Sequence, residues 1–218
     1  MPQRRAPRLS SRPSSRPLRT LAVLFAVLAL LAAQASCAAA PTPIPGHPRV
    51  RIETEKFGSM VVELYPEYAP ETVANFLSLA RSGFYDGLTF HRIVKGFMIQ
   101  GGDPKGDGTG GSEKRIKGEF IENGFQKNTL LHTTGVISMA RSKDMDSASS
   151  QFFLMDGAAT WLDGKYAAFG KIVEGKDTLD AIADVPVHVN PASGEKSQPD
   201  EPVVILSVVV LEETSPTP

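Results

Sequence analysis

The sequence contains a single cysteine, Cys37, so no disulfide can form within the chain. Any folded domain must therefore be stable through its hydrophobic core alone. The formal net charge is only −1 at pH 7, which excludes a strong long-range attraction to nucleic acid. The histidines (His47, His91, His132 and His188) are scattered, and the cysteine lies outside the expected domain. We therefore predict no metal site.

No hydrophobic run reaches the length of about 20 residues that a membrane-spanning helix needs. The longest wholly apolar run is Leu21–Ala33, and the first twenty positions before it hold six arginines and no acidic residue. A basic region followed by a short apolar region and small residues is typical of a secretory signal peptide, which we expect over residues 1–37. A buried helix is the alternative, but it would not need the arginines. The Arg4-Arg5 pair lacks the flanking pattern of a twin-arginine signal, which favours general secretion.

Cys37 follows the apolar run and is preceded by Gln34, Ala35 and Ser36. This arrangement resembles a bacterial lipoprotein box, in which the cysteine becomes the lipidated N-terminus of the mature chain. Gln34 departs from that pattern, which usually has leucine or another aliphatic residue at this position. Ordinary signal-peptidase cleavage nearby, for instance after Ala35, is the alternative. In either case we expect an extracytoplasmic protein, held at the cell membrane by a lipid if Cys37 is acylated and secreted otherwise.

Composition divides the rest of the chain into a linker, one domain and a tail. Residues 38–48 contain four prolines and no periodicity, which predicts a semi-extended linker. Residues 49–212 have the length of one domain. Residues 213–218 have a composition typical of disorder. The sequence contains no internal repeat.

Alternating apolar and polar residues predict two strands at 50–54 and 58–65, which we expect to form a hairpin. The clearest helix is expected at 70–82, because proline suits its first turn and its apolar residues fall on one face. A second helix is expected at 177–183. Further short strands are expected at 89–94, 97–100, 135–140, 151–155, 167–173 and 203–211. Many short strands, glycine-rich turns and two helices predict a mainly β fold, a closed β-barrel capped by helices.

One segment, residues 90–103, reads FHRIVKGFMIQGGD and resembles the signature of the cyclophilin family almost position by position. The resemblance continues, in order and with similar spacing, through GTGG at 108–111, GVISMA at 135–140, SQFF at 150–153, WLDGK at 161–165 and FGK at 169–171. It covers roughly residues 50–211. It implies an eight-stranded antiparallel barrel with two capping helices. The implied activity is peptidyl-prolyl cis-trans isomerisation, also called rotamase activity, in a groove on the outer face.

The resemblance also implies roles for particular residues. Arg92 would be the catalytic group, donating to the prolyl nitrogen or holding the adjacent carbonyl oxygen, and Gln100 would orient it. Substrate-binding residues would be Phe97, Met98, Ala140, Arg141, Phe153, Trp161, Leu162 and Tyr166. From spacing alone, the apolar members of this set would be assigned to the barrel core and Arg92 to the solvated surface. Only the resemblance reverses those assignments.

The sequence departs from the family at the rim of the groove. Tyr166 stands where histidine is frequent, and Arg141 stands where asparagine is frequent. These departures leave the ligand preference undetermined, but they do not change the reaction that the resemblance implies. The implied partners are proline-containing polypeptides, and cyclosporin-type cyclic peptides as inhibitors. The implied reaction needs no cofactor, because no covalent bond is made or broken. A cyclophilin-like module that binds proline-containing partners with little turnover is the alternative function.

One further motif, GDGTGG at 106–111, formally fits the pattern of a dinucleotide-binding loop. Such a loop needs a strand before it and a helix after it, and residues 112–118 have no helical pattern. We interpret the motif as a tight loop beside the groove. No G-x-S-x-G nucleophile motif occurs in the sequence.

Overall fold

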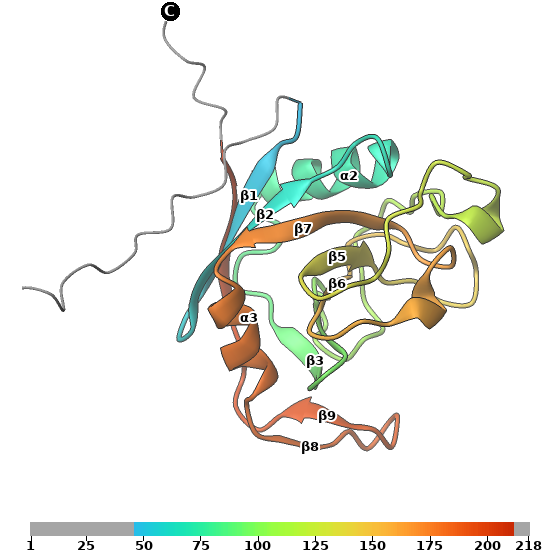
Figure 1. Ribbon diagram of the computed structural model, residues 1–218. Helices are drawn as coiled ribbons and strands as arrows, with labels where there is room; N and C mark the ends of the chain where they lie inside the picture. The colour runs from blue at the N-terminus through green and yellow to red at the C-terminus, as the bar shows by residue number, and fades with distance from the viewer. Residues whose placement is uncertain (1–45, 212–218) are drawn as a thin grey trace, which may run out of the picture. The chain divides into compact units, whose positions relative to one another are not determined.

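The computed structural model describes residues 46–211 (Figure 1). The expected signal peptide at 1–37, Cys37, most of the linker at 38–48 and the tail at 213–218 lie outside the described residues. Those expectations therefore stay predictions. Within the described part of the chain, no helix is long and apolar enough to cross a membrane.

Eight strands form one sheet in which every neighbouring pair is antiparallel, in the order β10-β1-β2-β7-β5-β6-β4-β3. The strands are β1 (Arg49–Thr54), β2 (Gly58–Leu64), β3 (Phe90–Val94), β4 (Met98–Gly101), β5 (Val136–Met139), β6 (Phe152–Met155), β7 (Ala168–Glu174) and β10 (Ile205–Leu211). Each lies within two residues of a predicted strand. The mainly β prediction is confirmed.

The sheet curls without closing into the barrel that the sequence predicts. Its two outer strands, β10 and β3, do not form a ladder with each other. They approach only at their starts, where Thr89 and Val204 form an isolated bridge and the Phe90 amide donates to the Val203 carbonyl at 2.9 Å. The prediction of a closed barrel was therefore overstated, because the few bonds at these starts do not continue into a ladder between β3 and β10.

Helix α2 (Pro70–Arg81) covers part of the sheet with its apolar face, as predicted (Figure 1). Val73, Phe76, Leu77 and Ala80 are all buried. No side chain of the helix caps its start. Instead the carboxylate of Glu119, which is itself buried, accepts hydrogen bonds from the amides of Glu71 and Thr72 at 3.0 and 2.8 Å. The negative charge of this carboxylate also interacts favourably with the positive end of the helix dipole. The second helix, α3 (Lys176–Ala183), was also predicted.

The two faces of the curled sheet bury different apolar clusters. The inner cluster contains the aromatic rings of Phe76, Tyr85, Phe152 and Phe169, with ring centroids 5.1–5.5 Å apart. Strand side chains alternate between faces, so Phe153 points away from its neighbour Phe152. Phe153 belongs to a smaller outer cluster completed by Met98, Val136, Met155, Ala159, Leu162 and Ala168. This outer cluster is the apolar surface on which a site can be built.

A hairpin that the sequence did not predict follows α3. It consists of β8 (Val187–Val189) and β9 (Lys196–Pro199), which among the described strands pair only with each other, in a separate two-stranded sheet. Strand β9 lies against β3, which carries Arg92 (Figure 1). The turn between β8 and β9 is thereby brought to the same side of the molecule as Arg92.

Candidate active site

A pocket of about 250 Å³ on the outer face brings together nine of the ten residues that the resemblance assigns to catalysis and substrate binding. They come from β3, β4 and the turn between them, from β6, and from the segments after β5 and around the short 3-10 helix Thr160–Leu162. The lining residues are Arg92, Phe97, Met98, Gln100, Ala140, Arg141, Phe153, Leu162 and Tyr166. The tenth, Trp161, lies outside this lining and is 61% exposed. Its ring stands 5.7 Å from that of Phe97, at the edge of the pocket.

The floor of the pocket is apolar and nearly buried. Met98, Phe153 and Leu162 are 1%, 5% and 8% exposed. Phe153 is held from behind by His132, whose ring stacks on it at 6.1 Å. His132 bonds to Asp163 at 2.9 Å and to Ser138 at 3.0 Å. Burial lowers the pKa of His132, so the ring is neutral near pH 7 and the floor stays uncharged. The floor therefore offers a dry surface for an apolar ring.

Arg92 projects from β3 beside this floor. The register of the β3–β4 ladder places it directly opposite Gln100, and its Nη1 donates to Gln100 Oε1 at 3.2 Å. The guanidinium carbon stands 5.8 Å from the centre of the Phe97 ring, within range of a cation–π contact. The side chain is 33% exposed. A charged hydrogen-bond donor thus stands at the boundary between water and the apolar floor.

A second partner of Arg92 was missed from the sequence. Glu195, in the turn between β8 and β9, accepts hydrogen bonds from Arg92 Nε at 2.6 Å and from Arg92 Nη2 at 2.9 Å. The Arg92 guanidinium is also the main reason why the pKa of Glu195 lies below its ordinary value. The turn-forming residues at 190–194, NPASG, could have indicated a hairpin here. Nothing local indicates a contact across 103 residues of sequence.

Gln100 continues the hydrogen-bond network away from Arg92. Its Nε2 donates to Gln151 Oε1 at 2.8 Å, and Gln151 Nε2 donates to the carbonyls of Gly108 and Gly110 at 3.1 and 2.7 Å. The GDGTGG loop is therefore tied to the site through two glutamines. Residues 112–118 after the loop are not helical, so the setting of a dinucleotide site is lacking.

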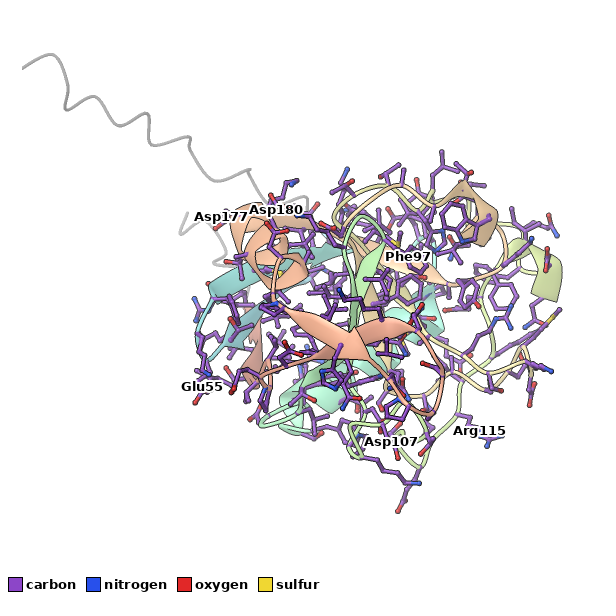
Figure 2. The ribbon with its side chains drawn as sticks, turned by 90° about the horizontal axis from the view of Figure 1, so that it is seen from below. Glu55, Phe97, Asp107, Arg115, Asp177 and Asp180 are labelled. Carbon is purple, nitrogen blue, oxygen red and sulfur yellow. The ribbon has the colours of Figure 1, made fainter. Side chains whose placement is uncertain are left out.

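The same loop borders a second, adjacent pocket of about 290 Å³, whose lining includes Arg115. In Figure 2, Arg115 and Asp107 are labelled at the lower edge of the view, away from Phe97. The two pockets share Gln100, Ala140 and Arg141 in their linings. Together they extend the site beyond one residue, which suits an extended chain better than a small molecule.

The rim residues are held in place by specific contacts. Arg141 donates from Nε and Nη2 to the carbonyl of Lys165 at 3.1 and 2.9 Å, and its guanidinium lies 4.6 Å from the Tyr166 ring. Tyr166 in turn meets Phe153 edge to face at 6.0 Å. The amide of Ala140 already donates to the Gln151 carbonyl at 2.9 Å. A bound peptide would have to use the carbonyl of Ala140 or the backbone of Arg141 instead.

Comparison with known families and structures identifies the family to which the chain belongs. The family described as cyclophilin type peptidyl-prolyl cis-trans isomerase/CLD matches residues 49–210. The chain is a member of the cyclophilin family. Its cyclophilin domain therefore belongs to a family of enzymes, the peptidyl-prolyl cis-trans isomerases.

Individual relatives agree with this assignment. The cyclophilin domain is 41% identical over 157 residues to peptidyl-prolyl cis-trans isomerase-like 1 of Gibberella zeae, covering 72% of this chain and 91% of that protein. It is 40% identical over 163 residues to peptidyl-prolyl cis-trans isomerase-like 2 of Neurospora crassa, covering 74% of this chain. The match spans only 26% of the length of that second relative. What the rest of such longer proteins does therefore says nothing about this cyclophilin.

A solved structure shows the same fold. The crystal structure of a cyclophilin type peptidyl-prolyl cis-trans isomerase from Cryptosporidium parvum has a TM-score of 0.66 and 32% sequence identity. The match covers 77% of this chain and 99% of that one. The Cryptosporidium protein has also been crystallised in the presence of the dipeptide Ala-Pro. These relatives come from fungi and a protozoan, so they do not bear on whether this cyclophilin is a bacterial lipoprotein.

Proposed function

We propose that this cyclophilin accelerates rotation about X-Pro bonds in unfolded or extended polypeptides outside the cytoplasm, and so assists their folding. One observation carries the catalytic part of the proposal. The guanidinium of Arg92 stands at the edge of a pocket whose floor is apolar and nearly buried. This arrangement suits a proline ring seated on the floor with its amide nitrogen turned toward the arginine.

The reaction requires a positioned substrate and a hydrogen-bond donor, and it requires neither a nucleophile nor a base. Amide resonance opposes rotation by about 18–20 kcal/mol. In the twisted transition state the nitrogen lone pair is localised, and the nitrogen becomes a hydrogen-bond acceptor that neither planar isomer offers. A donor that bonds only this state lowers the barrier, because catalysis depends on binding the transition state better than the ground state. In this proposal Arg92 is that donor, with Gln100 beside it.

Arg92 cannot supply the whole effect. A charge-assisted hydrogen bond is worth about 1.5–3 kcal/mol net. A rate gain of about 10⁵ needs roughly 7 kcal/mol. The remainder must come from the floor of Met98, Phe153 and Leu162, which seats the ring away from water, and from contacts that hold the flanking peptide. The adjoining second pocket gives the residues next to proline a place to bind.

The extracytoplasmic setting rests on the sequence. The arginine-rich start, the apolar run at 21–33 and the lone Cys37 support export and lipid attachment. Residues 38–48 would then act as a tether, reaching about 30 Å at roughly 3.1 Å per residue for a proline-rich chain. Mass spectrometry of the mature N-terminus, on protein from the producing cell, tests this part. A mature chain that begins with acylated Cys37 is expected, and an unacylated N-terminus would leave a secreted or uncleaved isomerase.

A protease-free isomerisation assay on the full chain, with a proline-containing peptide, tests the catalytic part. Measurable acceleration of cis-trans exchange over the uncatalysed rate is expected. The alternative is a binding module for proline-containing partners, and the existing ion pair between Arg92 and Glu195 is the observation that favours it, since it occupies two donors of the guanidinium. Peptide binding without acceleration of exchange would favour this second function.

A further inference from the structure

Glu195 is the acidic residue that contacts the proposed catalytic arginine, and its carboxylate uses both oxygens. Oε2 accepts from Arg92 Nε at 2.6 Å, and Oε1 accepts from Arg92 Nη2 at 2.9 Å. Two parallel bonds of this kind fix the plane of a guanidinium as well as its position. An arginine with a single partner could still rotate about its terminal bonds.

The donors that remain on Arg92 are still compatible with a role in catalysis. A guanidinium has five N–H donors. Glu195 uses the Nε donor and one Nη2 donor, and Gln100 uses one Nη1 donor. Among residues 46–211, one donor on Nη2 has no partner, and the second on Nη1 meets only the weak sulfur acceptor of Met98 at 3.6 Å. Glu195 therefore occupies one edge of the guanidinium and leaves donors at its end for a substrate.

The carboxylate is presented by a tight turn whose backbone is held at several points. The amide of Asn190 donates to the carbonyl of Glu195 at 2.8 Å, and the amide of Gly194 donates to the carbonyl of Asn190 at 2.8 Å. The side chain of Asn190 accepts from the amide of Ala192 at 2.8 Å. Gly194 takes the left-handed conformation, with φ +71°, that permits this turn. Glu195 is therefore anchored by its backbone and does not depend on a freely moving loop.

A role in overall stability explains this pair poorly. Both side chains are accessible to water, with 33% of Arg92 and 38% of Glu195 exposed. Exposed ion pairs contribute little to folding because water and salt screen them. Fixing the Arg92 side chain before the substrate reacts has a larger effect, and the effect is on the rate. A long side chain that becomes ordered only in the transition state loses rotamer freedom there, and this loss raises the barrier.

We propose that Glu195 is a positioning residue for isomerisation, holding the Arg92 guanidinium in the plane from which its free donors meet the twisted amide. The proposal rests on the proposed isomerase function. Under this proposal the β8–β9 hairpin takes part in the active site, although none of its residues lines the pocket of about 250 Å³ that contains Arg92.

The test compares Glu195→Gln and Glu195→Ala with the wild-type full chain in the protease-free assay. Glu201→Gln is the matched control, since it removes the same charge from an exposed residue that follows the hairpin. We expect kcat to fall about tenfold in both Glu195 variants. A fall of this size corresponds to the free energy needed to order one long side chain in the transition state. KM should stay within about twofold and Tm should match the control, because the floor of the pocket is untouched.

A double-mutant cycle with Arg92→Ala separates positioning from a general effect of the hairpin. If Glu195 acts through Arg92, Glu195→Gln has no further effect once Arg92 is absent. An equal loss in the Arg92→Ala background would overturn the inference, as would unchanged kcat in both Glu195 variants. A rise in kcat would also overturn it and would make the carboxylate an inhibitor of Arg92. Absence of turnover in the wild-type chain would overturn the proposed function itself, together with this inference.

Discussion

Replacement of Arg92 by alanine tests the proposed mechanism most directly. The substitution removes the donor to the twisted amide, together with the bonds to Glu195 and Gln100. A lost charge-assisted bond of about 1.5–3 kcal/mol in the transition state corresponds to a fall in kcat/KM of about 10- to 150-fold. The fold should survive, because the side chain is one third exposed and its ion pair is worth about 0.2–1 kcal/mol. For a domain of this size, that lowers Tm by at most about 4 °C.

The assay pairs protease-free isomerisation with thermal unfolding of the same preparations. Arg92→Lys is the informative companion, because a lysine keeps the charge but cannot donate to Glu195 along one edge and to the substrate from its end. We expect lysine to recover little of the lost activity. Near-normal turnover in a folded Arg92→Ala protein would refute the reasoning, since the apolar pocket alone would then account for catalysis.

Three further predictions concern pH, inhibitors and acid stability. The isomerisation rate should be nearly flat between about pH 6 and 9, because the proposed mechanism uses no general acid or base; a bell-shaped profile would reveal a missed proton transfer. Calorimetry should detect binding of cyclosporin-type peptides near Trp161, weakened by the departure at Tyr166; no binding at high micromolar peptide would contradict this. Burial lowers the pKa of both His91 and His132. As the pH falls, these two histidines are therefore protonated in the unfolded chain before they are protonated in the folded chain. Stability should be complete above about pH 6.5 and fall below it, and Tm should drop less steeply in His132→Gln; an equally steep drop would refute this assignment.

Elements with a local apolar pattern could be predicted from the sequence. The β1–β2 hairpin follows from alternation, and its register pairs Val50 with Val62 and Ile52 with Met60. Helix α2 follows from its apolar face and from the proline in its first turn. Pattern alone could not place Phe153 in the site, because the apolar pair at 152 and 153 gives no sign of which residue faces outward. Resemblance to the family supplied that placement.

Features that depend on contacts between distant polar residues could not be predicted. Glu119 caps α2 from 47 residues away. Glu195 reaches Arg92 from 103 residues away, in a hairpin whose strands of three and four residues are too short for a clear strand pattern. A carboxylate in a polar segment is usually solvated, and nothing in its neighbourhood distinguishes these two. Closure of the sheet was overestimated for the same reason, because it depends on whether two distant segments form a ladder or a single bridge.

The site therefore depends on two kinds of structure with different tolerance to change. Its floor is part of the outer apolar cluster, so a substitution at Phe153 disturbs the packing of the domain as well as the pocket. The partner of Arg92 comes from a hairpin that pairs only with itself and leaves the eight-stranded sheet intact. Changes in the β8–β9 turn can alter the orientation of the arginine without opening a cavity in the core. Under the proposed function, substitutions in the floor should change rate and stability together, whereas variants of the turn should change kcat while Tm stays nearly constant.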